Sequence, residues 1–104
     1  MKKPQGYADS ILQDKYECYL CHDDTSELDP HEIFFGSNRQ VSIKHGFWVW
    51  LRRDWHDANS PHETPHNNEL VDNYLRQICQ EKYEETHSHE SFMKLIGKNY
   101  LEVL

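Results

Sequence analysis

The sequence lacks any apolar run that approaches the roughly 20 residues of a membrane-spanning helix. The polar stretch after Met1 is not the apolar core of a signal peptide, so we expect a cytoplasmic protein without a membrane partner. Only 37% of the 104 residues are hydrophobic, and a core built from them would be small. We therefore expect a single domain, residues 1–104, that a bound metal ion helps to stabilise.

Cysteine is scarce and odd in number: there are three, and two of them form the motif Cys18-Tyr19-Leu20-Cys21. In a chain without an export signal, such a pair is more typical of a metal site than of a disulfide. Two thiolates on one turn supply half of a tetrahedral zinc site, so we expect Zn²⁺ as the cofactor. Candidates for the other half are His31, His45, His56, His62 and His66, with Asp54 and Asp57 as oxygen ligands.

Basic residues are also scarce, with 11 Lys and Arg against 18 Asp and Glu and a net charge of −7. Residues 1–40 and 61–104 each carry four basic and eight acidic side chains. Nucleic-acid binding depends on clustered Lys and Arg, so we expect no direct binding of nucleic acid. An ordinary solvated surface explains the acids equally well; the alternative is a surface that matches a basic protein partner. Its candidate residues are Asp72, Glu81, Glu84 and Glu85.

Glycine and proline, four of each, separate short predicted elements. Residues 7 to about 15 are expected to form a short helix, with Ile11 and Leu12 facing inward. Strands are predicted at 32–35 and 47–51, where aromatic and β-branched residues gather. A turn at Gly36-Ser37-Asn38 closes the first strand.

Two helices are predicted after the strands. The longer one begins at Asn67 or Asn68, which can cap it, and runs to about Glu85. The last begins after Ser88 and ends near Gly97. Their spacing predicts buried faces made of Leu70, Tyr74, Leu75, Ile78 and Cys79 in the longer helix, and of Phe92, Leu95 and Ile96 in the last.

Several short motifs follow one another between residues 16 and 101. After the Cys18–Cys21 motif come Pro30-His31-Glu32-Ile33-Phe34-Phe35-Gly36-Ser37-Asn38-Arg39, Ser42-Ile43-Lys44-His45-Gly46, Trp50-Leu51, and later 80–85 and 97–101. In this order and spacing the chain resembles phage and prophage HNH-like proteins. The resemblance implies an α+β fold with a ββα-metal core, in which a two-stranded hairpin and a following helix clamp a divalent ion, and with flanking helices.

The resemblance also implies roles for individual residues. His31 and Glu32 match the first-strand pair of a metal ligand and a general base, and His56 matches the metal-binding His at the start of the helix. The implied chemistry is phosphodiester hydrolysis. The chain departs from the family where a second zinc knuckle is expected, because Arg52 and Trp55 stand at its ligand positions.

Two metal arrangements therefore stay open. In the first, Cys18 and Cys21 bind Zn²⁺ together with His56 and one more ligand (Asp54, His31 or His62). In the second, the thiols are idle and His31 with His56 hold a divalent ion of the catalytic type. We favour the first, because thiolates prefer zinc.

The favoured function is that of a phage-encoded, non-catalytic zinc module that binds and inhibits a basic protein of the host cell. Phages encode small acidic proteins against host defences, including anti-CRISPR proteins. RNA-guided nucleases have positively charged channels that an acidic surface could obstruct. The alternative is a small metal-dependent HNH endonuclease that cleaves DNA with His31, Glu32 and His56. A structural or packaging-associated phage protein is a third possibility.

Overall fold

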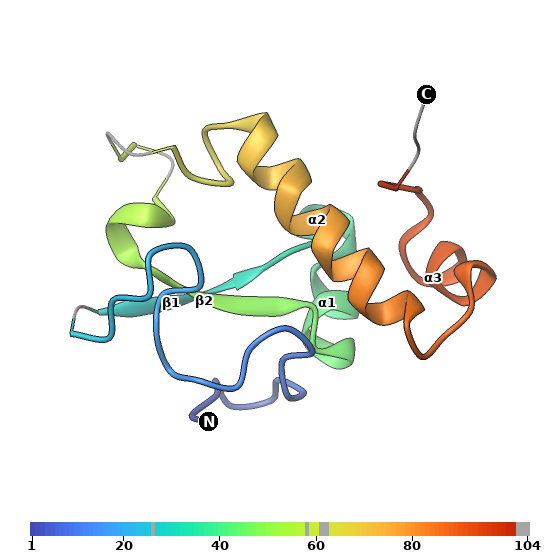
Figure 1. The fold of residues 1–104 in the computed structure, drawn as a ribbon, viewed down its shortest axis with the longest axis horizontal. Coiled ribbons are helices and arrows are strands. Elements are labelled where there is room, and N and C mark those ends of the chain that lie inside the picture. Colours follow the sequence, from blue (N-terminus) through green and yellow to red (C-terminus); the bar gives the residue numbers. More distant parts are fainter. Residues whose placement is uncertain (26, 58, 61–62, 102–104) are drawn as a thin grey trace.

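The computed structural model describes residues 1–25, 27–57, 59–60 and 63–101, which form a small α+β fold, as predicted (Figure 1). Within the described residues, no helix is both long enough and apolar enough to cross a membrane. The elements in chain order are β1 (Leu28–Glu32), η1 (Gly36–Asn38), α1 (Arg39–His45), β2 (Trp48–Arg52), η2 (Arg53–Trp55), α2 (Glu69–Glu84) and α3 (His89–Ile96).

Strands β1 and β2 form one antiparallel pair, with Leu28 opposite Arg52 and His31 opposite Val49. The first four residues of β2 are all buried, although the sheet has only two strands among the described residues. This burial requires cover on both faces of β2. Figure 1 shows α2 crossing the strand pair on one side and the N-terminal segment running along the other.

The N-terminal segment covers β2 as an irregular chain, so the helix predicted for residues 7 to 15 is wrong. Several of its polar groups bond to β2: the Trp48 Nε1–H donates to the Ala8 carbonyl at 2.7 Å, and the Trp50 amide donates to the Gln13 side chain at 2.9 Å. Ile11 and Leu12 still pack against the core, as predicted.

The chain between the two strands forms a helix that the sequence did not predict. The first strand also ends earlier than expected, at Glu32, while Ile33 and Phe34 continue into the core. Helix α1 then buries Ser42, whose hydroxyl accepts a hydrogen bond from the Phe34 amide at 3.1 Å and donates one to its carbonyl at 3.2 Å. A long-range contact of this kind leaves no periodic apolar pattern in a seven-residue helix.

Helices α2 and α3 lie where their caps predicted them. The Asn68 side chain accepts hydrogen bonds from the Leu70 and Val71 amides, and the Ser88 hydroxyl accepts one from the Ser91 amide. The buried face of α2 differs from the prediction, because Leu70 and Tyr74 are 79% and 53% exposed. The buried residues of α2 are Leu75, Cys79, Gln80 and Tyr83, and Ile78 packs against the core beside them, as predicted.

Aromatic rings fill the space between the sheet and these helices. Phe34 lies edge-on to Phe47 and Phe92, with ring centroids 5.7 and 5.6 Å apart, and Phe47 lies edge-on to Tyr83 at 5.4 Å. These are the arrangements that aromatic quadrupoles favour. Cys79 is buried beside them, and its burial raises the pKa of the thiol, in agreement with its predicted role as a core residue.

Replacing Gly46 by alanine should destabilise the protein much more than replacing Gly36. Both glycines have φ of +77°, so each alanine incurs a left-handed penalty of about 1–2 kcal/mol. At Gly36 an added Cβ meets nothing within 4 Å, whereas at Gly46 it would overlap the carbonyl oxygen of Asp9. We expect an additional loss of about 1–3 kcal/mol for Gly46→Ala in urea unfolding. Equal losses for the two variants would contradict the docking of the N-terminal segment.

Candidate metal centre

Three histidines from separate parts of the chain converge at one point. His31 lies on β1, His56 follows η2 directly, and His66 lies in the loop that leads to the Asn68 cap of α2. Their ligand atoms all lie within 4.8 Å of one another. Within the described ranges, no other group of three or more His, Cys, Asp or Glu side chains is placed to hold a metal ion.

The distances in this cluster suit a small cation. The Nε2 atoms of His56 and His66 are 3.0 Å apart, and the ring centroids of His31 lie 5.2 and 5.0 Å from those of His56 and His66. Nitrogen ligands about 2.0–2.1 Å from a tetrahedral zinc ion lie roughly 3.3 Å from each other. The observed spacing therefore needs only a small adjustment to accept the ion.

His31 is the most informative member of the cluster. Its side chain is 1% exposed, and neither ring nitrogen has a hydrogen-bond partner among the described residues. An unsatisfied buried polar group costs about 1–3 kcal/mol. Burial, reinforced by the nearby His56, His66 and Arg76, lowers the pKa of His31 well below its usual value, so the ring is neutral and offers a lone pair. A cation at the cluster would remove this cost, so the residues fit a metal ion.

A carboxylate lies beside His56, and charged groups act on the pKa of His66. The Nδ1 atom of His56 lies 3.6 Å from the Asp29 carboxylate, which Arg53 holds from the other side at 3.2 Å. A carboxylate behind a histidine ligand fixes the ring and strengthens its basicity. Burial and His56 lower the pKa of His66, while the charge of Glu32 opposes this shift.

Glu32 follows His31 on β1. The negative charge of its carboxylate acts to raise the pKa of His66. Its side chain is 13% exposed, and the Arg39 guanidinium binds it at 2.7 Å. Burial, together with the charge of this carboxylate, raises the pKa of Tyr7. The ion pair with Arg39 therefore holds Glu32 to α1.

The structure does not bring the two thiols of the Cys18–Cys21 motif to this cluster. The turn between them is closed by backbone hydrogen bonds from the Cys18 amide to Asp23 and from the His22 amide to Cys18. Burial raises the pKa of Cys21, and the neighbouring Arg52 acts against it. No third ligand residue joins the thiols within the part of the chain that the structure describes. His62, one of the predicted candidates, lies outside the described residues.

Arg52 explains why the thiols lack the ligands that a zinc knuckle would need. Its guanidinium binds the Asp54 carboxylate through two hydrogen bonds, at 2.8 and 2.7 Å, and lies 3.5 Å from Asp23. The positive charge of Arg52 therefore lies near Cys21. Arg52 also binds the carboxylate of Asp54, which was a predicted oxygen ligand. Of the predicted metal ligands, the structure joins His31 and His56 to His66, and it leaves Cys18 and Cys21 apart from them.

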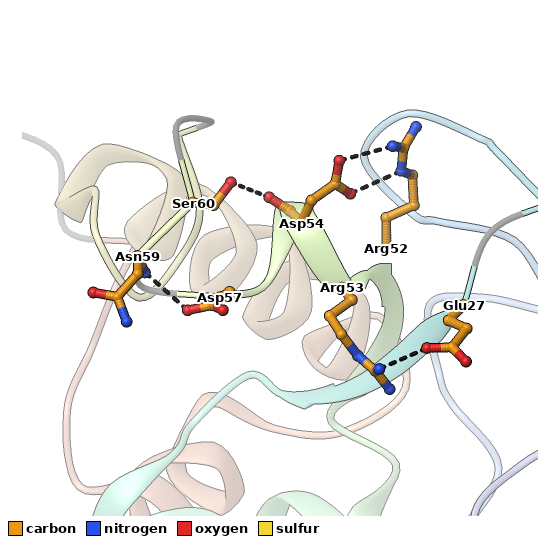
Figure 2. Close-up of a pocket in the computed structure, with 7 residues that line it drawn as sticks. All are labelled: Glu27, Arg52, Arg53, Asp54, Asp57, Asn59 and Ser60. Carbon is orange, nitrogen blue, oxygen red and sulfur yellow. Dashed lines mark hydrogen bonds and ion pairs between the residues drawn. The ribbon is translucent and has the colours of Figure 1, made fainter.

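A cavity of about 540 Å³ lies beside Arg52 and Arg53 (Figure 2). Figure 2 shows Arg52 pairing with Asp54 and Arg53 pairing with Glu27 across the cavity. Three acidic residues outnumber the two arginines, so the lining would not attract a polyanion. It consists of Glu27, Arg52, Arg53, Asp54, Asp57, Asn59 and Ser60.

Two of the four acids predicted to bind a partner are tied up within the protein. Asp72 is only 15% exposed in its side chain and binds Arg76 at 3.0 Å, so its prediction as a free surface acid is wrong; its burial raises its pKa. Glu84 accepts one hydrogen bond from Gln80 and lies 2.9 Å from His89. Glu81 and Glu85 are exposed, and Glu85 lies 3.4 Å from Lys82.

Comparisons with known proteins add no relative to these observations. No family model, no curated protein and no solved structure matches the chain. The resemblance to HNH-like proteins therefore rests on the chain's own motifs. The structure itself shows an α+β fold in which three histidines lie close enough to hold a metal ion.

One Zn²⁺ or Co²⁺ ion should bind per chain at the three histidines, and His66→Ala should weaken its binding at least tenfold. Loss of a residue that supports a metal ligand typically lowers metal affinity 10- to 100-fold, and loss of a ligand itself should lower it further. Isothermal titration calorimetry measures this directly. His87→Ala is the matched control, because His87 is exposed and lies outside the cluster. Weaker binding by Cys21→Ser with His66→Ala unaffected would place the ion at the thiols instead.

Proposed function

We propose that the chain is a metal-dependent hydrolase that cleaves phosphodiester bonds. The observation that carries this proposal is His31, a buried histidine that has no hydrogen-bond partner among the described residues and that converges with His56 and His66. Structural zinc sites use four protein ligands, whereas catalytic sites use three and leave one position open. Among the described residues three histidines converge, one of them exposed, and this number matches the open type.

The proposed division of roles follows from the positions of the side chains. His31, His56 and His66 would hold the ion, and Asp29 would orient His56. When bound, a divalent ion supplies positive charge that stabilises the developing charge on a phosphate and its leaving oxygen. The phosphodiester substrate is inferred from the resemblance to HNH-like proteins, because the cluster alone would suit several hydrolytic reactions.

Glu32 is our candidate for the general base that accepts a proton from the attacking water. It follows His31 on β1, its charge acts on the pKa of His66, and the Arg39 guanidinium binds it at 2.7 Å. A carboxylate can take this role where relatives of the resembled family use histidine. Fixing the base in place matters, because proton transfer requires it within hydrogen-bond distance of the water.

Cleavage of bis(p-nitrophenyl) phosphate and of a single-stranded DNA oligonucleotide tests this proposal, with Mn²⁺, Zn²⁺ and Mg²⁺ compared. We expect His31→Ala to abolish turnover. Glu32→Gln should reduce kcat by about 10²-fold or more while metal affinity stays the same. Glu90→Gln is the control, since Glu90 is exposed in the first turn of α3. Full activity in His31→Ala or Glu32→Gln would refute the assignment.

The charge distribution favours a second candidate function, binding and inhibition of a basic host protein. All four arginines of the chain pair with carboxylates, which weakens their attraction for a nucleic-acid backbone. The net charge of −7 would instead attract a positively charged surface, such as the guide–target channel of an RNA-guided nuclease. This function needs no metal chemistry, only a folded scaffold that presents exposed acids such as Glu81 and Glu85.

Inhibition of DNA cleavage by a purified RNA-guided nuclease tests the second candidate. We expect the double variant Glu81→Lys and Glu85→Lys to lose at least tenfold in potency. The control pair Asp14→Lys and Asp24→Lys changes the net charge equally on other exposed acids. His31→Ala should inhibit as well as the original chain. Equal potency of both charge-reversed pairs would exclude a specific acidic surface on α2.

A further inference from the structure

An apolar groove runs between the Cys18–Cys21 turn, η2 and the first turns of α2. Its volume is about 310 Å³, at the lower end of the range for ligand pockets and enough for one or two large side chains. None of the three clustered histidines lines it, so it is separate from the candidate metal centre. Its lining consists of Leu20, Trp55, Glu63, Leu70, Val71 and Tyr74.

Leu70 and Tyr74 make this groove unusual. They lie one turn apart on α2 and are 79% and 53% exposed, although the helix has a separate face that packs on the core. Only four large hydrophobic residues of the described chain are exposed, and these two lie together in one groove. Scattered exposed apolar residues need no explanation, but neighbouring ones that line a groove are typical of an interaction site. Tyrosine is also among the residues that most often anchor protein interfaces.

The charges around the groove restrict its occupant. Glu63 is the one charged residue in the lining, and Glu69 beside Leu70 adds a second exposed acid. A second copy of this chain would bring another net charge of −7, which opposes self-association. An acidic ligand would be repelled in the same way. The charges therefore favour a cationic occupant.

We propose that this groove docks a segment of a partner protein that carries a bulky apolar side chain flanked by Lys or Arg. The apolar side chain would pack between Leu70, Tyr74 and Trp55, and a flanking cation would pair with Glu63. Apolar contacts would supply most of the affinity, while the charges would select the partner and accelerate its association. The proposal stands independently of the metal centre, because it uses none of its residues.

Two synthetic peptides probe the groove on the full chain: one with a Leu-Trp pair flanked by lysines, and one in which glutamates replace those lysines. Binding is followed by ¹⁵N chemical shifts. We expect the lysine peptide to bind and to shift the amides of Leu20, Leu70 and Tyr74. The double variant Leu70→Ser and Tyr74→Ser should weaken binding at least tenfold. Gln77→Ser is the matched control, because Gln77 is exposed on the same helix but does not line the groove.

A third peptide separates apolar docking from nonspecific attraction to an acidic protein. It keeps the lysines but replaces the Leu-Trp pair by two serines, and we expect it not to shift these amides. Glu63→Gln should lower the affinity of the lysine peptide and reduce the salt dependence of its binding. Equal binding of the glutamate or serine peptide, or shifts outside the groove, would overturn the proposal. So would a dimer in sedimentation that the Leu70→Ser and Tyr74→Ser variant abolishes, since a second copy would then be the occupant.

Discussion

The structure depends on the desolvation of His31. His31 lies opposite Val49 near the end of β1, its side chain is buried, and no described residue offers its imidazole a hydrogen bond. A buried polar group without a partner is normally removed by selection or satisfied by its neighbours. Here the neighbours are two more histidines whose nitrogens converge on the same point. One bound cation would satisfy all three.

The rest of the fold holds these three histidines in their positions. The N-terminal segment bonds to Trp48 and Trp50 and seals one side of β2, while α2 and the aromatic rings seal the other. The end of β2 leads directly into η2 and His56, and the cap of α2 fixes the loop that carries His66. Arg52 meanwhile ties the thiol-bearing turn to the end of β2 through Asp23 and Asp54. That turn thus has an ionic crosslink where a knuckle would have a metal.

Local signals in the sequence predicted the local features of the fold. Asn68, Ser88 and Gly97 marked the ends of α2 and α3 because capping depends on a few adjacent residues. Strand β2 was found from its apolar composition. The irregular N-terminal segment and α1 were not predicted, because their form depends on hydrogen bonds to distant residues. His31 and His56, predicted as ligands together with Cys18 and Cys21, lie in the cluster, and His66 was one of several candidates that spacing alone could not rank. The exposure of Leu70 and Tyr74 was not predicted, because their helical pattern also fits burial.

X-ray absorption spectroscopy of the zinc-loaded chain tests the central claim most directly, because it reports the atoms bound to the metal. The three-histidine centre predicts a single shell of nitrogen and oxygen atoms at about 2.0–2.1 Å, with the outer scattering that imidazole rings produce. A sulfur shell at about 2.3 Å would contradict the account. It would show that Cys18 and Cys21 hold the ion and that the convergence of His31, His56 and His66 serves another purpose.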